Sequence, residues 1–485
     1  MNFLKTGSSI KSYNKLSNWF NFDKENVLQV YSGKIDIGQH ISSTLALIAS
    51  KITNIKYSQV EIVRLNTNIS PDEGKTASSL STPDSGTAIK SASIILRKNF
   101  INYALRELKI NLDEMIFENG IIKDIKSNKS ISYWDFAKTD NFKSLIIPIE
   151  IEDKDIKSLN YSNKQKVELK TIKNIVTGRY KYVHDLYFPN MLHARIIRPP
   201  NYFSKFKRID DDFQKILDIN NIKFVSKGSF LALVASDEFL VVKYLELIKK
   251  KIHWEYIKDL PNKNIHDALQ NNEKDTLLVK SGGEAYYEKI PNIKSFDNSN
   301  ITSLSSIFKK SYLMHGPIGP SAACAINTGN KYFIYSHSQA IYDLKFSISK
   351  YFDISPDNVT LEFAPGSGCY GHNGADDVAF EAAVLSKDFP NQHILLKWTR
   401  EDEHRWEPYG SASLNKIEGA INEKGKIVYW SNEVFSDTYL TRPSDAELDN
   451  FISYNLIRNN FENKRSKPKT AAHMGIHRNL DPLYN

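Results

Sequence analysis

The sequence predicts an α/β (α+β) fold, because strand-like runs alternate with helical runs and small-residue turns join them. The clearest example is residues 359–385, where a strand-like run leads through a turn with four glycines into an apolar helical run. The length of 485 residues, 41% of them hydrophobic, suits about two to four domains with a large core. Two polar stretches, residues 111–170 and 258–308, separate the patterned blocks and are predicted to be surface connectors.

The composition also limits the function. The net charge of +8 comes from lysines scattered along the chain, which indicates a solvated surface and no nucleic-acid partner. With only Cys324 and Cys369, a disulfide framework and an all-cysteine metal or iron–sulfur site are excluded. No apolar run predicts a membrane span, and the N-terminus shows no signal pattern. We expect a cytoplasmic protein, with periplasmic export alongside a signal-bearing partner as the alternative.

The first block, residues 1–110, is predicted to contain a strand–turn–helix unit. Residues 27–37 have the pattern of one or two strands, and a helix follows whose apolar residues recur at helical spacing. Gly38 and Gln39 occupy the turn between them, where Gln39 suits either a helix cap or a ligand contact. After a strand at 60–65, the hydroxyl-rich run 76–86 suits a solvated loop or a donor of hydrogen bonds to a polar ligand. The long helix beyond it carries Ala92, Leu96, Phe100 and Ala104 on one face.

Residues 171–257 are predicted to form a small α/β domain. The alternation of Leu192, Ala194 and Ile196 suits a half-buried strand that ends at a Pro-Pro pair. The run 229–235 is a second strand, and a helix follows it to about residue 250. Because polar stretches flank this block on both sides, we expect it to be separable from the rest.

The last block, residues 309–485, repeats the strand–turn–helix pattern twice. Residues 322–326 and 332–335 suit a hairpin, and Gln339 then lies at the start of a helix, where it could equally be a satisfied polar residue. Residues 359–363 form a strand before the glycine-rich turn 366–374. Such a turn leaves backbone N–H groups free at a helix N-terminus, which suits an anion, although its spacing fits neither the dinucleotide fingerprint nor the P-loop.

Three of these loops together resemble the xanthine dehydrogenase/aldehyde oxidase family. Residues 31–39 followed by 71–81 look like one cofactor-contacting segment, residues 178–200 resemble the a/b hammerhead domain, and residues 336–339 with 366–371 resemble a second cofactor segment. The first segment precedes the hammerhead here, an order similar to the large subunits of nicotinate dehydrogenase and isoquinoline 1-oxidoreductase. The resemblance implies molybdopterin-binding segments of mixed sheets and helices, residues 1–110 and 309–485, around a hammerhead at 171–257.

That resemblance also implies an activity and a set of site residues. The family hydroxylates aldehydes or N-heteroaromatics with oxygen from water, on a molybdenum–molybdopterin cofactor for which the cytosine dinucleotide form is one candidate. Electrons would pass to a 2Fe-2S small subunit, with a cytochrome as one candidate acceptor. Asn373 occupies a substrate-binding position, where xanthine-type enzymes have a carboxylate. The residues that match cofactor-contacting positions are Gly38, Gln39, Ser78, Ser79, Ser81, Gln339, Gly366, Gly368, Cys369, Tyr370 and Gly371.

A pterin offers amide-like edges and a phosphate tail, and its dithiolene supplies the metal ligands, so no protein metal ligand is required. Two features depart from the family pattern. His40 replaces the second glycine of its Gly-Gln-Gly motif, and the catalytic glutamate of the family lies beyond the position that matches Asn485. We therefore expect the N-terminal portion of a molybdenum hydroxylase large subunit, inactive without its C-terminal remainder. The alternative is a non-catalytic remnant that acts as an assembly or binding module.

Overall fold

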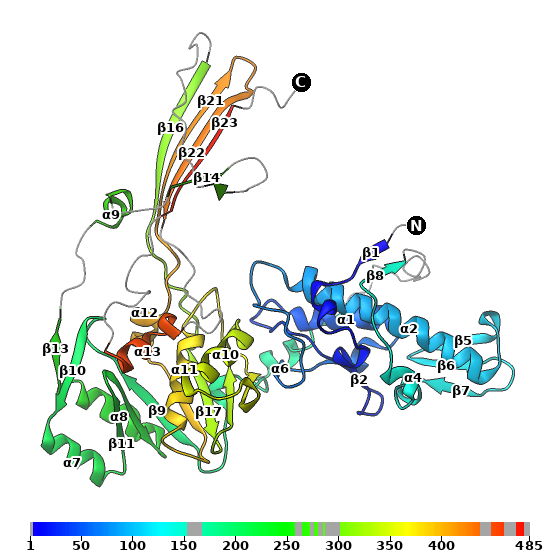
Figure 1. Cartoon of the computed structure of the whole chain (residues 1–485), viewed down its shortest axis with the longest axis horizontal. Coiled ribbons are helices and arrows are strands. Elements are labelled where there is room, and N and C mark those ends of the chain that lie inside the picture. The colour runs from blue at the N-terminus through cyan, green and yellow to red at the C-terminus, as the bar shows by residue number, and fades with distance from the viewer. Residues whose placement is uncertain are drawn as a thin grey trace.

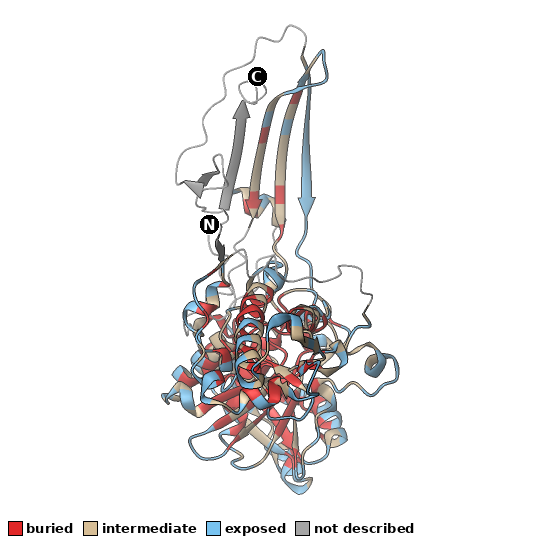
Figure 2. Cartoon of the chain, turned by 90° about the vertical axis from the view of Figure 1, so that its right-hand side faces the viewer, coloured by how far each residue is buried: buried red, intermediate tan, exposed pale blue. Residues whose placement is uncertain are grey.

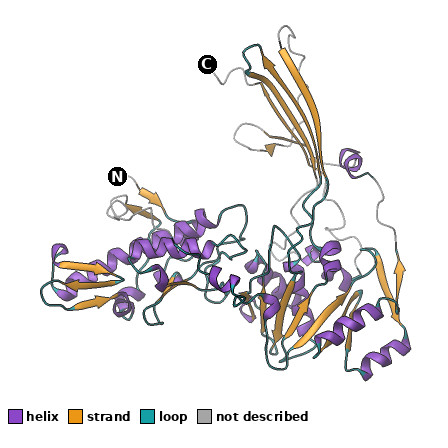
Figure 3. Ribbon diagram, turned by 180° about the vertical axis from the view of Figure 1, so that it is seen from behind, coloured by secondary structure: helices purple, strands orange, loops and turns teal. Residues whose placement is uncertain are grey.

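The computed structural model describes residues 3–152, 167–257, 264–271, 276–279, 285–286, 301–436, 448–459 and 472–479. Figure 1 shows three parts: an N-terminal unit of helices and small sheets, a body built on a large mixed sheet, and a second sheet that projects from the body. The same arrangement is seen from behind in Figure 3. Helices and sheets are mixed throughout, as the sequence predicts. Among the described residues, no helix is both long and apolar enough to cross a membrane.

The N-terminal unit packs two helices against a three-stranded sheet. Its strands are β2 (Phe20–Asn21), β3 (Leu28–Val30) and β4 (Val60–Ile62), and its helices are α1 (Ile41–Thr53) and α2 (Thr87–Leu108). The face of α2 predicted from the sequence, with Ala92, Leu96, Phe100 and Ala104, is fully buried. Residues 31–40 form an irregular loop in place of the expected second strand. The helix cap is at His40 and not at Gln39, and the His40 side chain makes no capping hydrogen bond.

The structure differs from the predicted connector at 111–170. Its described first part adds a three-stranded sheet and two short helices to the N-terminal unit: β5 (Met115–Glu118), β6 (Ile121–Asp124), β7 (Ser130–Ser132), α3 (Tyr133–Ala137) and α4 (Asp140–Lys143). Ile122, Tyr133, Phe136 and Phe142 join the same hydrophobic core as Phe100. Strand β8 (Glu150–Glu152) then pairs with β1 (Phe3–Lys5). The stretch is mostly polar, so its few widely spaced aromatic residues did not predict a core from the sequence. In the structure these aromatic residues anchor it.

The body is organised by a seven-stranded mixed sheet, and helices cover both of its faces. One face packs against α10 (Ile341–Phe352) and α11 (Ala375–Ser386), and the other packs against α7 (Asp211–Ile219) and α8 (Glu238–Ile248). In spatial order the strands are β11 (Lys223–Lys227), β12 (Phe230–Ala235), β9 (Leu192–Ile197), β20 (Ile394–Lys397), β17 (Ala322–Asn327), β18 (Tyr332–Ser336) and β19 (Val359–Phe363).

Residues 171–257 share this sheet, so they do not form the separate unit that the sequence suggested. Strand β9 pairs in parallel with β20, which joins the segment to a strand about 200 residues further along the chain. The alternating side chains of β9 and β12 divide between two cores, one on each face of the sheet. A smaller pair, β10 (Ser204–Ile209) with β13 (Ile252–Tyr256), adds to the edge of the segment.

Arg198, just after β9, strengthens this junction. Its guanidinium lies 2.7 Å from the Glu381 carboxylate and over the rings of Trp398 and Trp406. The charge is buried, so breaking this pair would leave an uncompensated ion inside the protein.

The projecting sheet contains residues from both ends of the second predicted connector. Its order is β15 (Ala285–Tyr286), β14 (Thr276–Val279), β23 (Ala472–Asn479), β22 (Ile427–Ser436), β21 (Ser413–Asn422) and β16 (Ile301–Lys310). Residues 301–308 were expected to belong to the connector at 258–308, but they form most of β16. Other parts of that connector lie outside the described residues. The short helix α9 (Ile265–Asn271) packs at the base of this sheet.

The N-terminal unit reaches the body through residues 65–67. The Phe363 N–H donates to the Leu65 carbonyl at 2.8 Å, and the Thr67 N–H donates to the Leu361 carbonyl at 3.0 Å. These bonds extend the edge of the large sheet beyond β19, and Leu65 is buried in the core of the body. The loop after β19 is therefore held beside the N-terminal unit.

Replacing Phe136 by alanine tests the corrected assignment of residues 111–152. Phe136 is 1% exposed, so Phe136→Ala should lower the free energy of unfolding by about 3–5 kcal/mol through lost burial and a new cavity. Chemical denaturation measures the change. Ile149, in the same stretch but 61% exposed, is the matched control, and Ile149→Ala should change stability by less than about 0.5 kcal/mol. Similar small effects at both positions would favour the surface connector.

Candidate functional site

Two neighbouring parallel strands bring the predicted glutamine and glycine loops together. Strands β18 and β19 pair in parallel, with Ser336 opposite Phe363 at their carboxyl ends. The loop with Gln339 leaves β18 and the loop 364–374 leaves β19. Both loops therefore lie at the same edge of the sheet, where open α/β sheets generally bind ligands.

Gln339 connects three segments that are distant in the sequence. Its Nε2 donates to the Thr76 carbonyl at 2.8 Å, and the Thr76 N–H donates back to the Gln339 carbonyl at 2.9 Å. The thiol of Cys369, in the glycine loop, donates to the Gln339 Oε1 at 3.4 Å. The hydroxyl-rich segment, the glutamine loop and the glycine loop thus meet at one side chain.

The same network reaches Gln39. The Ile35 N–H donates to the Thr76 Oγ1 at 3.0 Å, and the Gln39 Nε2 donates to the Ile35 carbonyl at 2.9 Å. The Gln39 Oε1 accepts from the Ile37 N–H at 2.7 Å. Both ends of the Gln39 amide are therefore bonded within its own loop, and Gln39 shapes the loop that contains Gly38.

Glu73 and Lys34 hold that loop against the hydroxyl-rich segment, a role that the sequence analysis missed. The Glu73 carboxylate accepts from the Gly33 N–H at 2.8 Å and from the Ser85 hydroxyl at 2.6 Å, while the Lys34 ammonium donates to the Glu73 and Lys75 carbonyls. Burial raises the pKa of Glu73, and the bonds from Ser85 and Gly33 oppose that shift. Glu73 lies close to Lys34 in space but 39 residues away in the sequence, so no local sequence pattern predicts that they interact.

Ser78, Ser79 and Ser81 lie in the hydroxyl-rich segment, on its solvent side. Ser78 and Ser79 are exposed and have positive φ angles of 54° and 58°, so their backbone makes a tight turn. Ser81 is half-buried and precedes a π-helical turn that leads into α2. Hydroxyl groups on a rigid turn can donate hydrogen bonds to a polar ligand.

The glycine loop needs its glycines for space as well as for conformation. Gly368 and Gly371 have φ angles of 104° and 137°, which favour glycine. A Cβ on Gly371 would lie 2.3 Å from the His315 ring, and a Cβ on Gly366 would lie 2.8 Å from the His337 Nδ1. The loop therefore packs directly on two imidazoles. Burial lowers the pKa of His337 to about 3, so that ring is neutral and its Nε2 accepts from the Ala322 N–H.

Polar groups at the start of α11 anchor the glycine loop from below. Asp376 accepts from the Ser338 hydroxyl and from the His372 Nε2, and Asp377 accepts from the Ile452 N–H at 3.1 Å. The N-cap position of α11 is Gly374, and both aspartates lie in the first turn of the helix. The Asn373 Oδ1 accepts from the Ala375 N–H at 3.2 Å. Its buried Nδ2 has no hydrogen-bond partner in the described part of the chain.

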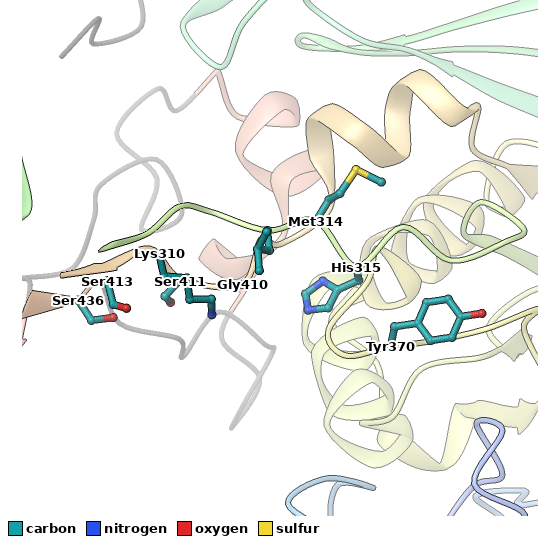
Figure 4. Close-up of a pocket in the computed structure, with 9 residues that line it drawn as sticks. Lys310, Met314, His315, Tyr370, Gly410, Ser411, Ser413 and Ser436 are labelled. Carbon is teal, nitrogen blue, oxygen red and sulfur yellow. The ribbon is translucent and has the colours of Figure 1, made fainter. Parts of the chain in front are cut away.

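A pocket of about 630 Å³ opens beside the loop, at the base of the projecting sheet. Figure 4 shows Tyr370 and His315 on its body side and the serines of the sheet opposite. Tyr370 is 62% exposed, whereas Cys369 is 3% exposed and Asn373 is 2% exposed, and neither of these two lines the pocket. The lining residues are Lys310, Leu313, Met314, His315, Tyr370, Gly410, Ser411, Ser413 and Ser436.

Two buried glutamates on α12 (Arg400–Trp406) and just beyond it tie the pocket loops together. Glu407 accepts from the His315 N–H at 2.5 Å, and Glu403 accepts from the Ser321 N–H at 2.7 Å and lies 3.5 Å from the Gly374 N–H. Burial and, to a smaller extent, the adjacent Glu403 carboxyl raise the pKa of Glu407 to about 7, although the hydrogen bond from the His315 N–H acts to lower it. Burial likewise raises the pKa of Glu403. In the sequence this stretch is only a run of charged residues, 400–405.

No group of three or more His, Cys, Asp and Glu side chains in the described part of the chain is arranged to hold a metal ion. Both cysteines are buried thiols that form no disulfide. The arrangement therefore offers amide, hydroxyl and backbone donors around a glycine loop, next to a pocket with an aromatic wall.

The sequence is similar to molybdenum cofactor proteins. The family described as Molybdopterin cofactor-binding domain matches residues 2–178. A subunit of the nicotinate dehydrogenase of Pseudomonas putida is 26% identical over 417 residues, which span 83% of this chain and 34% of that protein. A protein of Gluconacetobacter polyoxogenes named membrane-bound aldehyde dehydrogenase (pyrroloquinoline-quinone) is 20% identical over 88% of this chain and 57% of its own length. The chain thus spans between about a third and somewhat over half of these relatives.

Solved structures were also matched. Quinoline 2-oxidoreductase from Pseudomonas putida 86 is 14% identical, with a TM-score of 0.40, over 55% of this chain and 38% of that chain. The aldehyde oxidoreductase of Desulfovibrio gigas is 16% identical, with a TM-score of 0.41, over 53% of this chain and 32% of that chain.

Removing the Gln339 amide should loosen the junction of the three segments. Gln339→Ala leaves the Thr76 carbonyl and the Cys369 thiol without this partner, at a cost of about 1–2 kcal/mol in the free energy of unfolding. Hydrogen exchange should rise in peptides that cover residues 70–86 and 364–374. Gln59→Ala is the matched control, because the Gln59 Nε2 also donates to a carbonyl, that of Asn26, far from the junction. Equal exchange in the two variants would show that Gln339 does not join the segments.

Replacing Glu407 by glutamine should change how stability depends on pH. The folded pKa of about 7 lies above the ordinary value of 4.5, so the unfolded chain loses this proton first as the pH rises. Stability due to Glu407 is therefore full below pH 4.5 and lost by about pH 7. Glu407→Gln should melt like the wild type near pH 5 and at least about 2 °C higher near pH 8.

The control for this change is on the same helix. The exposed Glu401 pairs with Lys249 at 3.0 Å, and hydrogen bonding to Lys249 lowers the pKa of Glu401. Glu401→Gln should bring no gain at pH 8. A melting temperature of Glu407→Gln that stays parallel to the wild type from pH 5 to pH 8 would contradict the raised pKa.

Proposed function

We propose that this chain, which matches a molybdopterin cofactor-binding domain over residues 2–178, is the cofactor-holding portion of the large subunit of a molybdenum hydroxylase. One observation carries the proposal: Gln339 joins the three segments that resemble the family's cofactor loops. These segments are separated by up to about 290 residues in sequence, and a shared ligand would explain why they converge.

The residues at the junction have the chemistry that a pterin requires. Its amide-like edges call for side-chain amides and hydroxyls, and its phosphate tail calls for backbone N–H groups and hydroxyls. The buried Asn373 Nδ2 lacks a partner in the described residues, and the hydroxyls of Ser78 and Ser79 are exposed on a rigid turn. We propose that Ser78, Ser79, Ser81, Gln339 and the glycine loop hold the cofactor. Gln39 would act through its loop, because its amide bonds only within that loop, whereas the Gln339 amide bonds to two other segments of the site.

Bound there, the cofactor would supply the redox chemistry that transfers oxygen from water to a substrate carbon and accepts two electrons. The chain itself would orient the pterin and supply one wall of the substrate pocket. Tyr370 lines that pocket together with His315, and we propose a planar aldehyde or N-heteroaromatic as the substrate. Asn373 lies behind the loop and would contact the cofactor before it contacts a substrate.

Several features of the complete enzyme belong to the same proposal. Electrons would leave through a 2Fe-2S partner subunit, and the general base would be a glutamate on the C-terminal remainder. The relative from Gluconacetobacter polyoxogenes is named for pyrroloquinoline-quinone. The family model that matches residues 2–178 describes a molybdopterin cofactor-binding domain. For this reason we propose molybdopterin as the cofactor, with the cytosine dinucleotide form as one candidate.

Purified chain should therefore be inactive alone and active only with its partners. Dye reduction with aldehydes or N-heteroaromatics should appear when a polypeptide with the missing glutamate and an iron–sulfur subunit are supplied. In that enzyme, Gln339→Ala should lower activity and the molybdenum and pterin content at least about fivefold, an effect of about 1 kcal/mol at the site. Lys243→Ala, a surface change, should leave all three unchanged.

The outcomes separate the candidate functions. Robust turnover by residues 1–485 alone would show that the base has been misplaced. Absence of molybdenum and pterin from the assembled protein would favour the non-catalytic assembly or binding module.

A further inference from the structure

The projecting sheet has one apolar face and one polar face. Antiparallel pairing places Leu304 of β16, Gly419 of β21 and Trp430 of β22 in one row across the sheet. Because side chains alternate along a strand, the rows two residues away share the same face. Besides Leu304, Gly419 and Trp430, the positions on this face are Thr302, Ser306, Phe308, Asn415, Ile417, Ile421, Ile427, Asn432 and Val434, and we call it the apolar face.

Its large side chains are open to solvent. The exposed fraction is 77% for Leu304, 55% for Phe308, 49% for Ile427 and 40% for Ile421. Trp430 is 37% exposed and its ring covers Gly419, where an added Cβ would lie 3.3 Å from the ring. In Figure 2 the described strands of this sheet stand clear of the body and show mostly exposed or intermediate residues. Contiguous exposed apolar side chains mark an interaction surface.

The opposite face differs in composition and in packing. It carries the charged residues of the paired strands, Lys416, Glu418 and Glu433, together with Ser303 and Ser305, and its apolar positions include Ile301, Ile307 and Ala420. At its base, Leu414 and Phe435 pack against α9 in a small core. The sheet therefore has a covering layer at one end of the polar face, whereas no described element covers the apolar face.

We propose that the apolar face is the docking surface for the C-terminal remainder of the large subunit. A sheet with one apolar face is stable only when a second layer buries that face. The curated relatives extend well beyond the part that this chain matches, which is 34% of one and 57% of the other. Strand β23, the last described element, lies in this same sheet, so polypeptide that follows it starts beside the surface. The inference rests on the proposed function, which supplies the remainder.

The test measures whether the apolar face is covered in the enzyme as purified from its host. Leu304→Cys and Phe308→Cys probe the apolar face, and Ile307→Cys, 60% exposed on the same strand, probes the opposite face. The native Cys324 and Cys369 are buried, so a maleimide should label the introduced thiols. Labelling at 304 and 308 should be at least tenfold slower than at 307, and all three should label equally after denaturation.

A photo-cross-linking experiment identifies the polypeptide that covers the apolar face. Benzoylphenylalanine at position 304 should link to a peptide of the large subunit beyond residue 485, identified by mass spectrometry. Equal labelling of the three thiols, or a cross-link to a second copy of this chain or to the iron–sulfur subunit, would overturn the inference.

Molybdenum content of the same samples tests the proposed function separately. If positions 304 and 308 are protected from maleimide and the expected cross-link forms but the samples contain no molybdenum, the proposed function is contradicted and the docking surface is supported. If the samples contain molybdenum but position 304 is not protected from maleimide, only the docking surface is contradicted.

Discussion

The parallel pairing of β18 and β19 is the constraint on which the candidate site depends. It places the ends of two strands, and therefore the glutamine and glycine loops, at one edge of the sheet. The bonds of β19 to residues 65–67 then bring the N-terminal unit to the same edge. Gln339 completes the junction because a single amide can donate to Thr76 and accept from Cys369. Without the pairing of β18 with β19, the three segments would not meet at one edge of the sheet. None of the three carries a strong sequence motif by itself.

Buried charge supports the loops around this junction. Glu73 and Lys34 hold the first loop, and Glu403 with Glu407 holds the 315–321 segment against the glycine loop. The carboxylates of Glu73, Glu403 and Glu407 accept hydrogen bonds from backbone N–H or hydroxyl donors, which offsets part of the cost of burying them, although the Glu407 Oε2 has no partner in the described residues. Such groups restrict the positions of loops that would otherwise be free to move. A rigid frame of this kind is what a site needs when its ligand must be held in one orientation.

The projecting sheet connects the proposed docking surface to the pocket. Its pocket is bounded by the glycine loop on one side and by the base of the projecting sheet on the other. That sheet leaves an apolar face open, while the body is closed by helices on both sides of its own sheet. A partner layer on the apolar face would therefore be tied through β16 and β21 to Lys310 and Ser413 of the pocket.

The sequence by itself determined the strand–turn–helix units, the buried face of α2 and the positions of the candidate loops, because periodicity and glycine placement are local properties. Only the tertiary structure decided that residues 111–152 carry core aromatics, that 171–257 share a sheet with β20, and that Gln39 bonds to its own loop. Glu73, Glu403 and Glu407 were also beyond reach from the sequence. Burial and pairing across tens or hundreds of residues depend on which strands become neighbours, and no local pattern specifies that choice.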